Sequence, residues 1–311
     1  MGFVVIFLLT LFILPNTVRA DKAELSLFKT KAKKNNQAAY RQTYQNRGRI
    51  EVGLRLMGGG FWLMRNDVND HLQGFNDYYS DIPLSSVNSE LEPINMGMDF
   101  SGEILINFTP HFGIGIGSGY ITAKKESTAE VFYDIYTEEV GAYPKFSAIP
   151  VTLSLYYGVP IGKAVKIMFD AGLGYYMGTI DWEFYEIYNV DYGYEKTWNA
   201  TSNTIGFHGG IHFEFGFTQN SAFVIGAKGR YAKFTDISSD LEYDSRTPFS
   251  TVSYTIEDAM LWYGSWYRGV GEYPGIFIND DGGTYCSWTY ERKGEVNLSG
   301  IVFQAGLKII F

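Results

Sequence analysis

Alternation of apolar and polar residues with a period of two constrains this chain more than any other feature of its sequence. From Arg49 onward the pattern recurs in eight segments, each about as long as a tilted strand that crosses a bilayer. The first segment, RIEVGLRLM, places Ile50, Val52 and Leu54 on one face and Glu51 and Arg55 on the other. The remaining segments are residues 98–108, 111–121, 149–157, 165–176, 205–217, 223–231 and 299–311.

The composition agrees with strands rather than helices. The 311 residues include 24 Tyr, 23 Phe and 35 Gly, and aromatic residues are favoured in strands while Gly marks turns and close backbone contacts. The formal net charge of -9 argues against a nucleic-acid partner, which would require a basic face. Cys286 is the single cysteine, so the chain has no internal disulfide framework.

The connections between the segments alternate in length. Three are short turns near residues 109–111, 158–163 and 218–221, and four are long and polar, roughly 65–95, 124–145, 181–203 and 236–295. Short turns at one end and long loops at the other are typical of bacterial outer-membrane barrels. We therefore predict an all-β fold: a closed up-and-down antiparallel transmembrane β-barrel, most simply of eight strands. Ten strands are the alternative, because 238–295 is long enough to contain another hairpin.

The distribution of bulky residues predicts which face meets lipid. A water-soluble barrel would place the apolar residues inside. An eight-stranded lumen has too little room for Phe207, Phe213, Phe215 and Phe217 from one strand together with the other apolar rows. Glycines and polar residues therefore belong inside, and the aromatic residues belong outside.

The first residues have a different character. Residues 1–20 contain an apolar run from Phe3 to Leu14 and a small-residue site at Val18 to Ala20, which predicts a cleaved signal peptide, with an uncleaved anchor as the alternative. No Lys or Arg precedes the run. We interpret 21–48, which is basic and rich in Gln and Asn, as a periplasmic linker, and 49–311 as the barrel.

Two stretches carry a family resemblance. The ending QAGLKIIF, with Gln304, Gly306, Ile309 and Phe311, resembles the C-terminal assembly signal of outer-membrane barrels. TPHFGIGIGSGY and IPVTLSLYYGVPIGKAVKIMFDAGLGYY are similar to hairpins of the small eight-stranded family typified by OmpW and OmpX. The resemblance implies a bacterial outer-membrane location, contact with membrane lipid and lipopolysaccharide, and insertion by the barrel-assembly machinery.

The inward face carries a balanced set of charged and polar residues, which predicts a lumen filled by ion pairs rather than an open pore. The predicted network comprises Glu51, Arg55, Asp99, Glu103, Lys166, Asp170, His208, His212, Glu214, Lys228, Arg230 and Lys308.

Catalytic and metal-binding patterns are weak. His208 and His212 lie four residues apart, roughly 13 Å along a strand, so they cannot chelate one ion unaided. We expect them to bond acidic groups across the lumen. Asp67, Asp70 and His71 fall in one predicted loop without a recognisable protease motif. We predict a non-enzymatic protein without metal or cofactor.

The last long loop is unusually aromatic. Trp262, Trp266, Tyr267 and Trp288 form either a recognition surface for an extracellular ligand or a folded cap, and both readings stay open. The sequence therefore predicts a structural or surface-recognition barrel. The alternative is a narrow channel for small hydrophobic molecules, as in OmpW.

Overall fold

The computed structural model describes residues 50–311 except 84, 135, 162–163, 189–191, 268 and 280–287. All of the described residues belong to one compact unit, Asn46–Phe311. The predicted signal peptide and the whole predicted linker lie outside the described residues. Within the described part, no helix is long and apolar enough to span a membrane.

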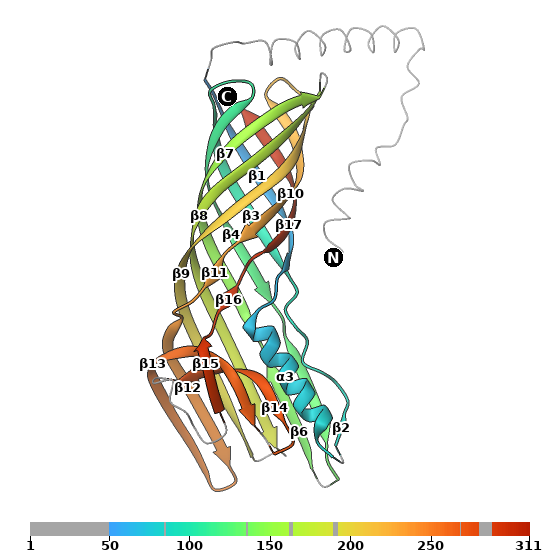
Figure 1. The fold of residues 1–311 in the computed structure, drawn as a ribbon, viewed down its shortest axis with the longest axis vertical. Coiled ribbons are helices and arrows are strands. Elements are labelled where there is room, and N and C mark those ends of the chain that lie inside the picture. Colours follow the sequence, from blue (N-terminus) through green and yellow to red (C-terminus); the bar gives the residue numbers. More distant parts are fainter. Residues whose placement is uncertain are drawn as a thin grey trace, which may run out of the picture. The chain divides into compact units, whose positions relative to one another are not determined.

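A closed ring of eight antiparallel strands forms one end of this unit (Figure 1). Each strand pairs with its neighbours in chain order, and the last pairs with the first through contacts such as Leu54 with Ile309. The predicted count of eight therefore describes the ring. Its members are β1 (Glu51–Leu63), β3 (Met96–Asn107), β4 (Phe112–Lys124), β7 (Lys145–Ile161), β8 (Val165–Tyr188), β9 (Tyr192–Gly216), β10 (Ser221–Tyr231) and β17 (Gly300–Ile310).

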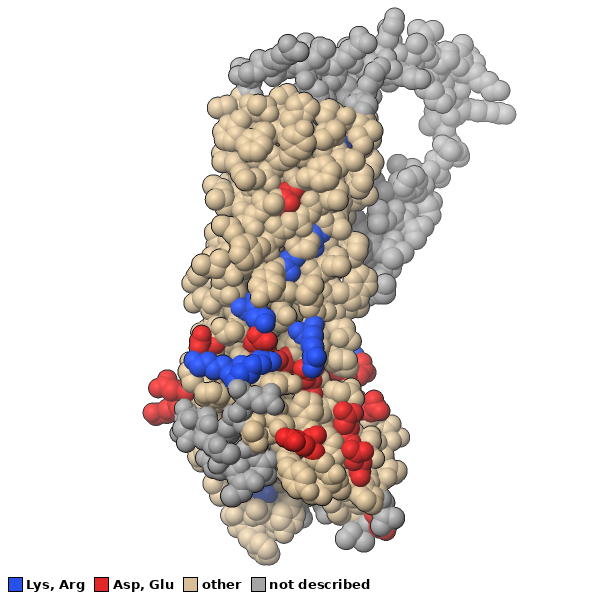
Figure 2. Space-filling model, viewed as in Figure 1, with Lys and Arg blue, Asp and Glu red and all other residues tan. Residues whose placement is uncertain are grey.

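The two faces of the ring differ as the alternation requires. Polar side chains point inward and are buried, while large apolar side chains are exposed on the outside. On the face shown in Figure 2, charged residues gather beyond the ring and the ring itself is almost uncharged. The outward apolar belt includes Val52, Phe100, Ile104, Ile116, Leu153, Leu173, Phe207, Ile301 and Phe303.

The prediction of a third long loop, at residues 181–203, is wrong. Residues 181–203 are not a loop, because β8 and β9 run on past the ring as one hairpin whose paired residues reach from Val165–Phe215 to Tyr188–Tyr192. The polar residues that suggested a loop alternate with buried Trp182, Phe184 and Trp198. The period of two therefore continues, and the polar partners face outward.

The extended hairpin is the centre of a second layer of structure, which we call the cap (Figure 1). From β9 the sheet continues through β12, β13 and β14, and from β8 it continues through β6, β5 and β2. The remaining long connections are thus largely structured rather than loops. The bounds of the cap strands are β2 (Ser86–Val87), β5 (Ser127–Phe132), β6 (Thr137–Ala142), β11 (Lys233–Phe234), β12 (Ser238–Thr247), β13 (Ser250–Tyr267), β14 (Glu272–Asn279), β15 (Trp288–Lys293) and β16 (Val296–Asn297).

Helix α3 (Asp67–Asp81) packs against β14 and contributes to the cap core. Asn66 caps its first turn, because the side-chain oxygen accepts a hydrogen bond from the Val68 amide at 3.1 Å. The helix ends before Ile82, whose helical conformation is disfavoured by the following Pro83. The predicted loop around Asp67, Asp70 and His71 is therefore wrong, since these residues lie on a helix.

Candidate functional site

The predicted lumenal residues form several separate polar groups inside the ring. Arg55 lies 2.5 Å from Glu103, whose carboxylate also accepts a hydrogen bond from Tyr156 at 2.5 Å. A second contact joins His212 to Asp170 at 2.6 Å. His208 contacts Ser154 at 2.9 Å rather than an acidic group.

The two ends of the lumen are also joined by charged contacts. Near the cap, Arg230 lies 2.5 Å from Asp99, which accepts a second hydrogen bond from Gln304 at 2.8 Å. Toward the other end, Lys308 lies 2.9 Å from Glu214. The other predicted lumenal residues are a buried Lys166 and the half-buried Glu51 and Lys228.

The lumen leaves little empty space. The cavity bounded by Arg55, Glu103, Asp170 and His208 has a volume of about 30 Å³. That is room for at most a few water molecules. Among the residues that the structure describes, no cluster of His, Cys, Asp or Glu is placed to hold a metal ion.

The proposed assembly signal lies on the last strand. Gln304 is buried, Ile309 and Phe311 are exposed, and the Phe311 amide donates to the Val52 carbonyl at 2.9 Å. A Cβ at Gly306 would lie 1.9 Å from the carbonyl oxygen of Leu56, so this position requires glycine for the strand pairing.

The predicted loop aromatics whose side chains are described differ in burial. Trp266 is buried in the cap, with its ring centroid 5.1 Å from those of both Phe75 and Tyr78. Trp262 is half-buried and Tyr267 is exposed. The backbone of Trp288 pairs with Trp266, and its side chain lies outside the described part.

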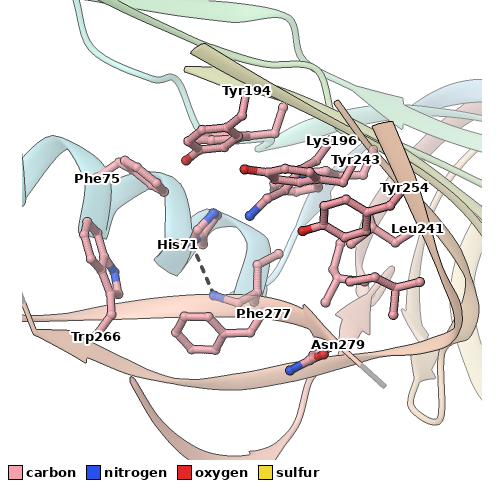
Figure 3. A pocket seen from close by; sticks show the side chains of 15 residues that line it. His71, Phe75, Tyr194, Lys196, Leu241, Tyr243, Tyr254, Trp266, Phe277 and Asn279 are labelled. Atoms are coloured by element: carbon pink, nitrogen blue, oxygen red, sulfur yellow. Dashed lines mark hydrogen bonds between the residues drawn. The ribbon is translucent and has the colours of Figure 1, made fainter. Parts of the chain in front are cut away.

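The cap contains a pocket of about 440 Å³ between α3 and the curled sheet (Figure 3). This volume falls in the range of small-molecule sites, and its lining is mainly aromatic and aliphatic, as such sites require. The lining residues are His71, Phe75, Trp182, Phe184, Tyr194, Lys196, Leu241, Tyr243, Tyr254, Ile256, Trp266, Ile276, Phe277, Ile278 and Asn279.

One wall of the pocket is a tyrosine ladder, which we define as Tyr194, Tyr243 and Tyr254. The rings of Tyr194 and Tyr243 stack at 5.9 Å with an interplanar angle of 17°, and Tyr254 follows at 4.8 Å from Tyr243. The rings come from β9, β12 and β13, which are neighbouring strands. The ladder lines this side of the pocket with aromatic rings.

Lys196 brings a positive charge to this wall. Its ammonium lies 5.1 Å from the ring centre of Tyr194 and 5.8 Å from that of Tyr243, within reach of a cation–π interaction. Figure 3 shows the side chain extending past Tyr243 toward His71. The charge is thus held in a mainly apolar pocket.

His71 lies on the opposite wall and is neutral at neutral pH. Burial, with a smaller contribution from the charge of Lys196, lowers its pKa to about 3. Its Nδ1 accepts a hydrogen bond from the Ile276 amide at 3.2 Å, which assigns the imidazole proton to Nε2. The ring therefore joins α3 to β14 and leaves Lys196 as the charged group among the described lining residues.

Sequence reasoning missed most of this pocket. Of its lining residues, only Trp266 was among the predicted recognition residues. Two signals pointed to the others: Val68, Leu72, Phe75 and Tyr79 recur at helical spacing, and alternation continues through Trp182, Phe184, Tyr194 and Lys196. Both signals lay inside segments interpreted as loops.

Two solved structures have a backbone course similar to that of this chain. The outer membrane protein OprG from Pseudomonas aeruginosa is 10% identical, and the match covers 85% of this chain and 97% of that one with a TM-score of 0.38. The outer membrane protease OmpT from Escherichia coli is 13% identical, with 84% and 95% covered and a TM-score of 0.28. No protein-family model and no curated protein matches the sequence.

Proposed function

We propose that this chain is a non-enzymatic bacterial outer-membrane β-barrel whose cap recognises a small apolar molecule outside the cell. The ring and its apolar belt support the membrane part of the proposal. An exposed belt of Phe, Ile and Leu around a closed ring is unfavourable in water and favourable in lipid, where closure leaves no unpaired strand edge. The finer relationship to the OmpW and OmpX family is part of this proposal.

The pocket in the cap supports the recognition part of the proposal. It lies in the portion of the chain that extends beyond the belt, and its lining is mainly aromatic and aliphatic. Rigid aromatic side chains supply contact area at low entropic cost, because they have few rotatable bonds. An apolar molecule that enters the pocket would exchange water contacts for these rings.

The polar lumen favours recognition over the channel alternative. A hydrophobic molecule that moved along the axis would have to displace the Arg55–Glu103 and Asp99–Arg230 pairs, which are buried and tightly bonded. Separating such pairs without replacement partners costs several kcal/mol, roughly 3–5. Axial passage of apolar solutes is therefore the weaker proposal.

Equilibrium dialysis of 2-naphthamide against the full chain in lipid nanodiscs tests the proposal, with empty nanodiscs as the blank. We expect saturable binding of one molecule per chain. Ile278→Trp, which places a large ring in the pocket, should weaken binding at least about tenfold, or 1.4 kcal/mol. Ile205→Trp on the exposed belt is the matched control and should leave binding unchanged.

Two results would contradict the proposal. One is uptake no greater than that of empty nanodiscs. The other is an affinity that Ile278→Trp and Ile205→Trp alter equally, because binding would then not depend on the pocket.

A further inference from the structure

A surface pocket of about 250 Å³ lies where the outer face of the ring meets the cap. Two of its lysines, Lys124 at the end of β4 and Lys145 at the start of β7, are cross-strand partners. We propose that this pocket, the lysine pocket, binds the phosphate group of an anionic membrane lipid, which both ammonium groups contact at once. The inference goes beyond recognition in the cap and rests only on the membrane part of the proposed function.

The lysine pocket lies at the level expected of lipid headgroups. On the outer face of β4, exposed Tyr120 is followed by Thr122 and then by Lys124. On β7, exposed Ile149 also lies four residues from Lys145. Four residues span roughly 13 Å along a strand, or about 10 Å along the membrane normal when the strand is tilted by about 40°. The headgroup layer is about 5–7 Å thick, and a lysine side chain can bend toward it, so both ammonium groups can reach lipid phosphates.

The pairing of the two lysines favours an anion between them. Both side chains point outward, since their neighbours Ala123 and Phe146 are buried on the inner face. Directly opposite Cβ atoms are about 5 Å apart, and like charges at such positions are destabilising. A phosphate that accepts a hydrogen bond from each ammonium removes this repulsion. Lys125, the third lysine of the pocket, pairs with Glu92, so the phosphate is assigned to the other two.

Carboxylates compete with the phosphate for the two lysines, but the competition is weak. Lys145 lies 2.7 Å from Asp181, and Lys124 lies 3.2 Å from Glu126. The side chains of both pairs are between 35% and 66% exposed, and exposed ion pairs contribute little to stability. Glu183 also lines the pocket and is exposed. Each carboxylate can therefore turn toward water while the lysines contact the lipid.

Native mass spectrometry of the full chain in a non-ionic detergent tests the proposal. The protein is titrated with dioleoylphosphatidylglycerol or with dioleoylphosphatidylcholine, which share their acyl chains and differ in net charge, so contact with the apolar belt is the same for both. Each basic residue near a membrane surface strengthens binding to anionic lipid by roughly fivefold. With two lysines and their competing carboxylates, we expect the first phosphatidylglycerol to bind about tenfold more tightly than the first phosphatidylcholine.

Paired variants assign the preference to this pocket. Lys124→Gln/Lys145→Gln should reduce it to less than about threefold and leave phosphatidylcholine binding within about twofold of wild type, which also reports an intact belt. Lys124→Arg/Lys145→Arg should keep the preference. Lys233→Gln/Lys293→Gln is the matched control, because these two lysines also form ion pairs and do not line the pocket.

Asp181→Asn provides a test in the opposite direction. It removes the carboxylate that competes for Lys145, so the preference for phosphatidylglycerol should rise by about threefold. A lysine that only stabilised the fold through this ion pair would not give such a gain. An unchanged preference in this variant would overturn the contact between Lys145 and the lipid.

The other outcomes separate the possible failures. Equal affinity of wild type for both lipids would overturn the headgroup site and leave the membrane part of the proposed function standing. Equal losses of preference in the two double glutamine variants would overturn the assignment to this pocket. Competition by sn-glycerol 3-phosphate at the concentration of the lipid would overturn the assignment to a lipid, because a free phosphate would then suffice. Retention of neither lipid would contradict the membrane part as well.

Discussion

The Nδ1 atom of His71 accepts a hydrogen bond from the backbone amide of Ile276 at 3.2 Å, which joins the N-terminal part of helix α3 to strand β14. The two elements approach closely because Gly74 lies one turn further along the helix, where an added Cβ would be 2.2 Å from the Pro274 carbonyl oxygen. The opposite side of the helix is held by Asn76, which exchanges two hydrogen bonds of 2.9 Å with the backbone of Leu91. Helix α3 is therefore fixed on both sides of the cap.

Gly74→Ala should loosen this attachment. The new methyl group forces the helix away from Pro274, and overpacking of this kind costs about 1–3 kcal/mol. Hydrogen exchange measured by mass spectrometry should show faster exchange in α3 and β14, with little change in the ring. Gly60→Ala is the matched control, because its Cβ would have no neighbour closer than 3.6 Å. Equal effects of the two substitutions would contradict the close-approach argument.

Acid should destabilise the cap through His71. The folded-state pKa of about 3 lies below the ordinary value of 6.5, so the unfolded state binds the extra proton first as the pH falls. Neutral His71 makes its full contribution to the free energy of unfolding above pH 6.5. This contribution decreases toward pH 3, by up to about 1.4 kcal/mol per pH unit. Urea titrations that follow tryptophan fluorescence should show this loss in wild type. His71→Gln should flatten it; an unchanged slope would exclude His71 as its source.

A rise in pH should also destabilise the cap, through Glu138. This buried carboxyl accepts hydrogen bonds from Tyr79 at 2.5 Å and Tyr133 at 3.1 Å, and burial together with Glu186 raises its pKa from 4.5 to about 8. The folded state therefore holds a proton that the unfolded state has lost. The stability that this proton contributes is fully present below pH 4.5, decreases as the pH rises, and is lost above pH 8.

Glu138→Gln tests this second effect, since the amide keeps the shape and cannot ionise. In wild type we expect urea midpoints to fall between pH 6.5 and 8, where the stability change from His71 is already complete, and in the variant we expect the fall to be smaller. Glu130→Gln serves as the control, because Glu130 lies on the neighbouring strand β5 and is only half-buried. A wild-type midpoint that rises across this range would contradict the raised pKa.

The sequence predicted those parts of the structure that each strand shows in its own residues, and it did not predict the parts that depend on which segments pack together. The ring followed from alternation alone, because each strand shows its inward and outward sides in its own residues, as Asp99 and Phe100 do. The cap did not follow in the same way. Polar residues such as Glu183 and Glu195 alternate with the buried side chains of β8 and β9, and their polarity resembled that of a loop. The pocket requires residues from α3 and from five strands, β8, β9, β12, β13 and β14, to meet, and no local sequence pattern indicates which strands become neighbours.

The buried pair Asp99–Arg230 offers a test of how the lumen is stabilised. Arg230 lies 2.5 Å from Asp99, donates to the Leu298 carbonyl at 3.0 Å and packs over the Phe61 ring, so the pair joins several strands of the ring. Removal of one partner leaves a buried charge uncompensated. Asp99→Asn should therefore cost about 3–5 kcal/mol. The exposed pair Lys145–Asp181 is the matched comparison, and Lys145→Met should cost less than about 1 kcal/mol.

The double variant Asp99→Asn/Arg230→Met separates the charge from the packing. If the cost in Asp99→Asn comes from the stranded guanidinium, replacement of the arginine by an apolar side chain should recover much of it, since a buried ion pair is often no more stable than apolar residues of similar volume. The urea concentration at which the refolded protein loses its heat-resistant electrophoretic form measures all three variants. A double variant that is less stable than Asp99→Asn would show instead that the hydrogen bond to Leu298 and the contact with Phe61 contribute more than the charge. In that case Arg230 would stabilise the ring mainly by holding the end of β10 against the chain that enters β17.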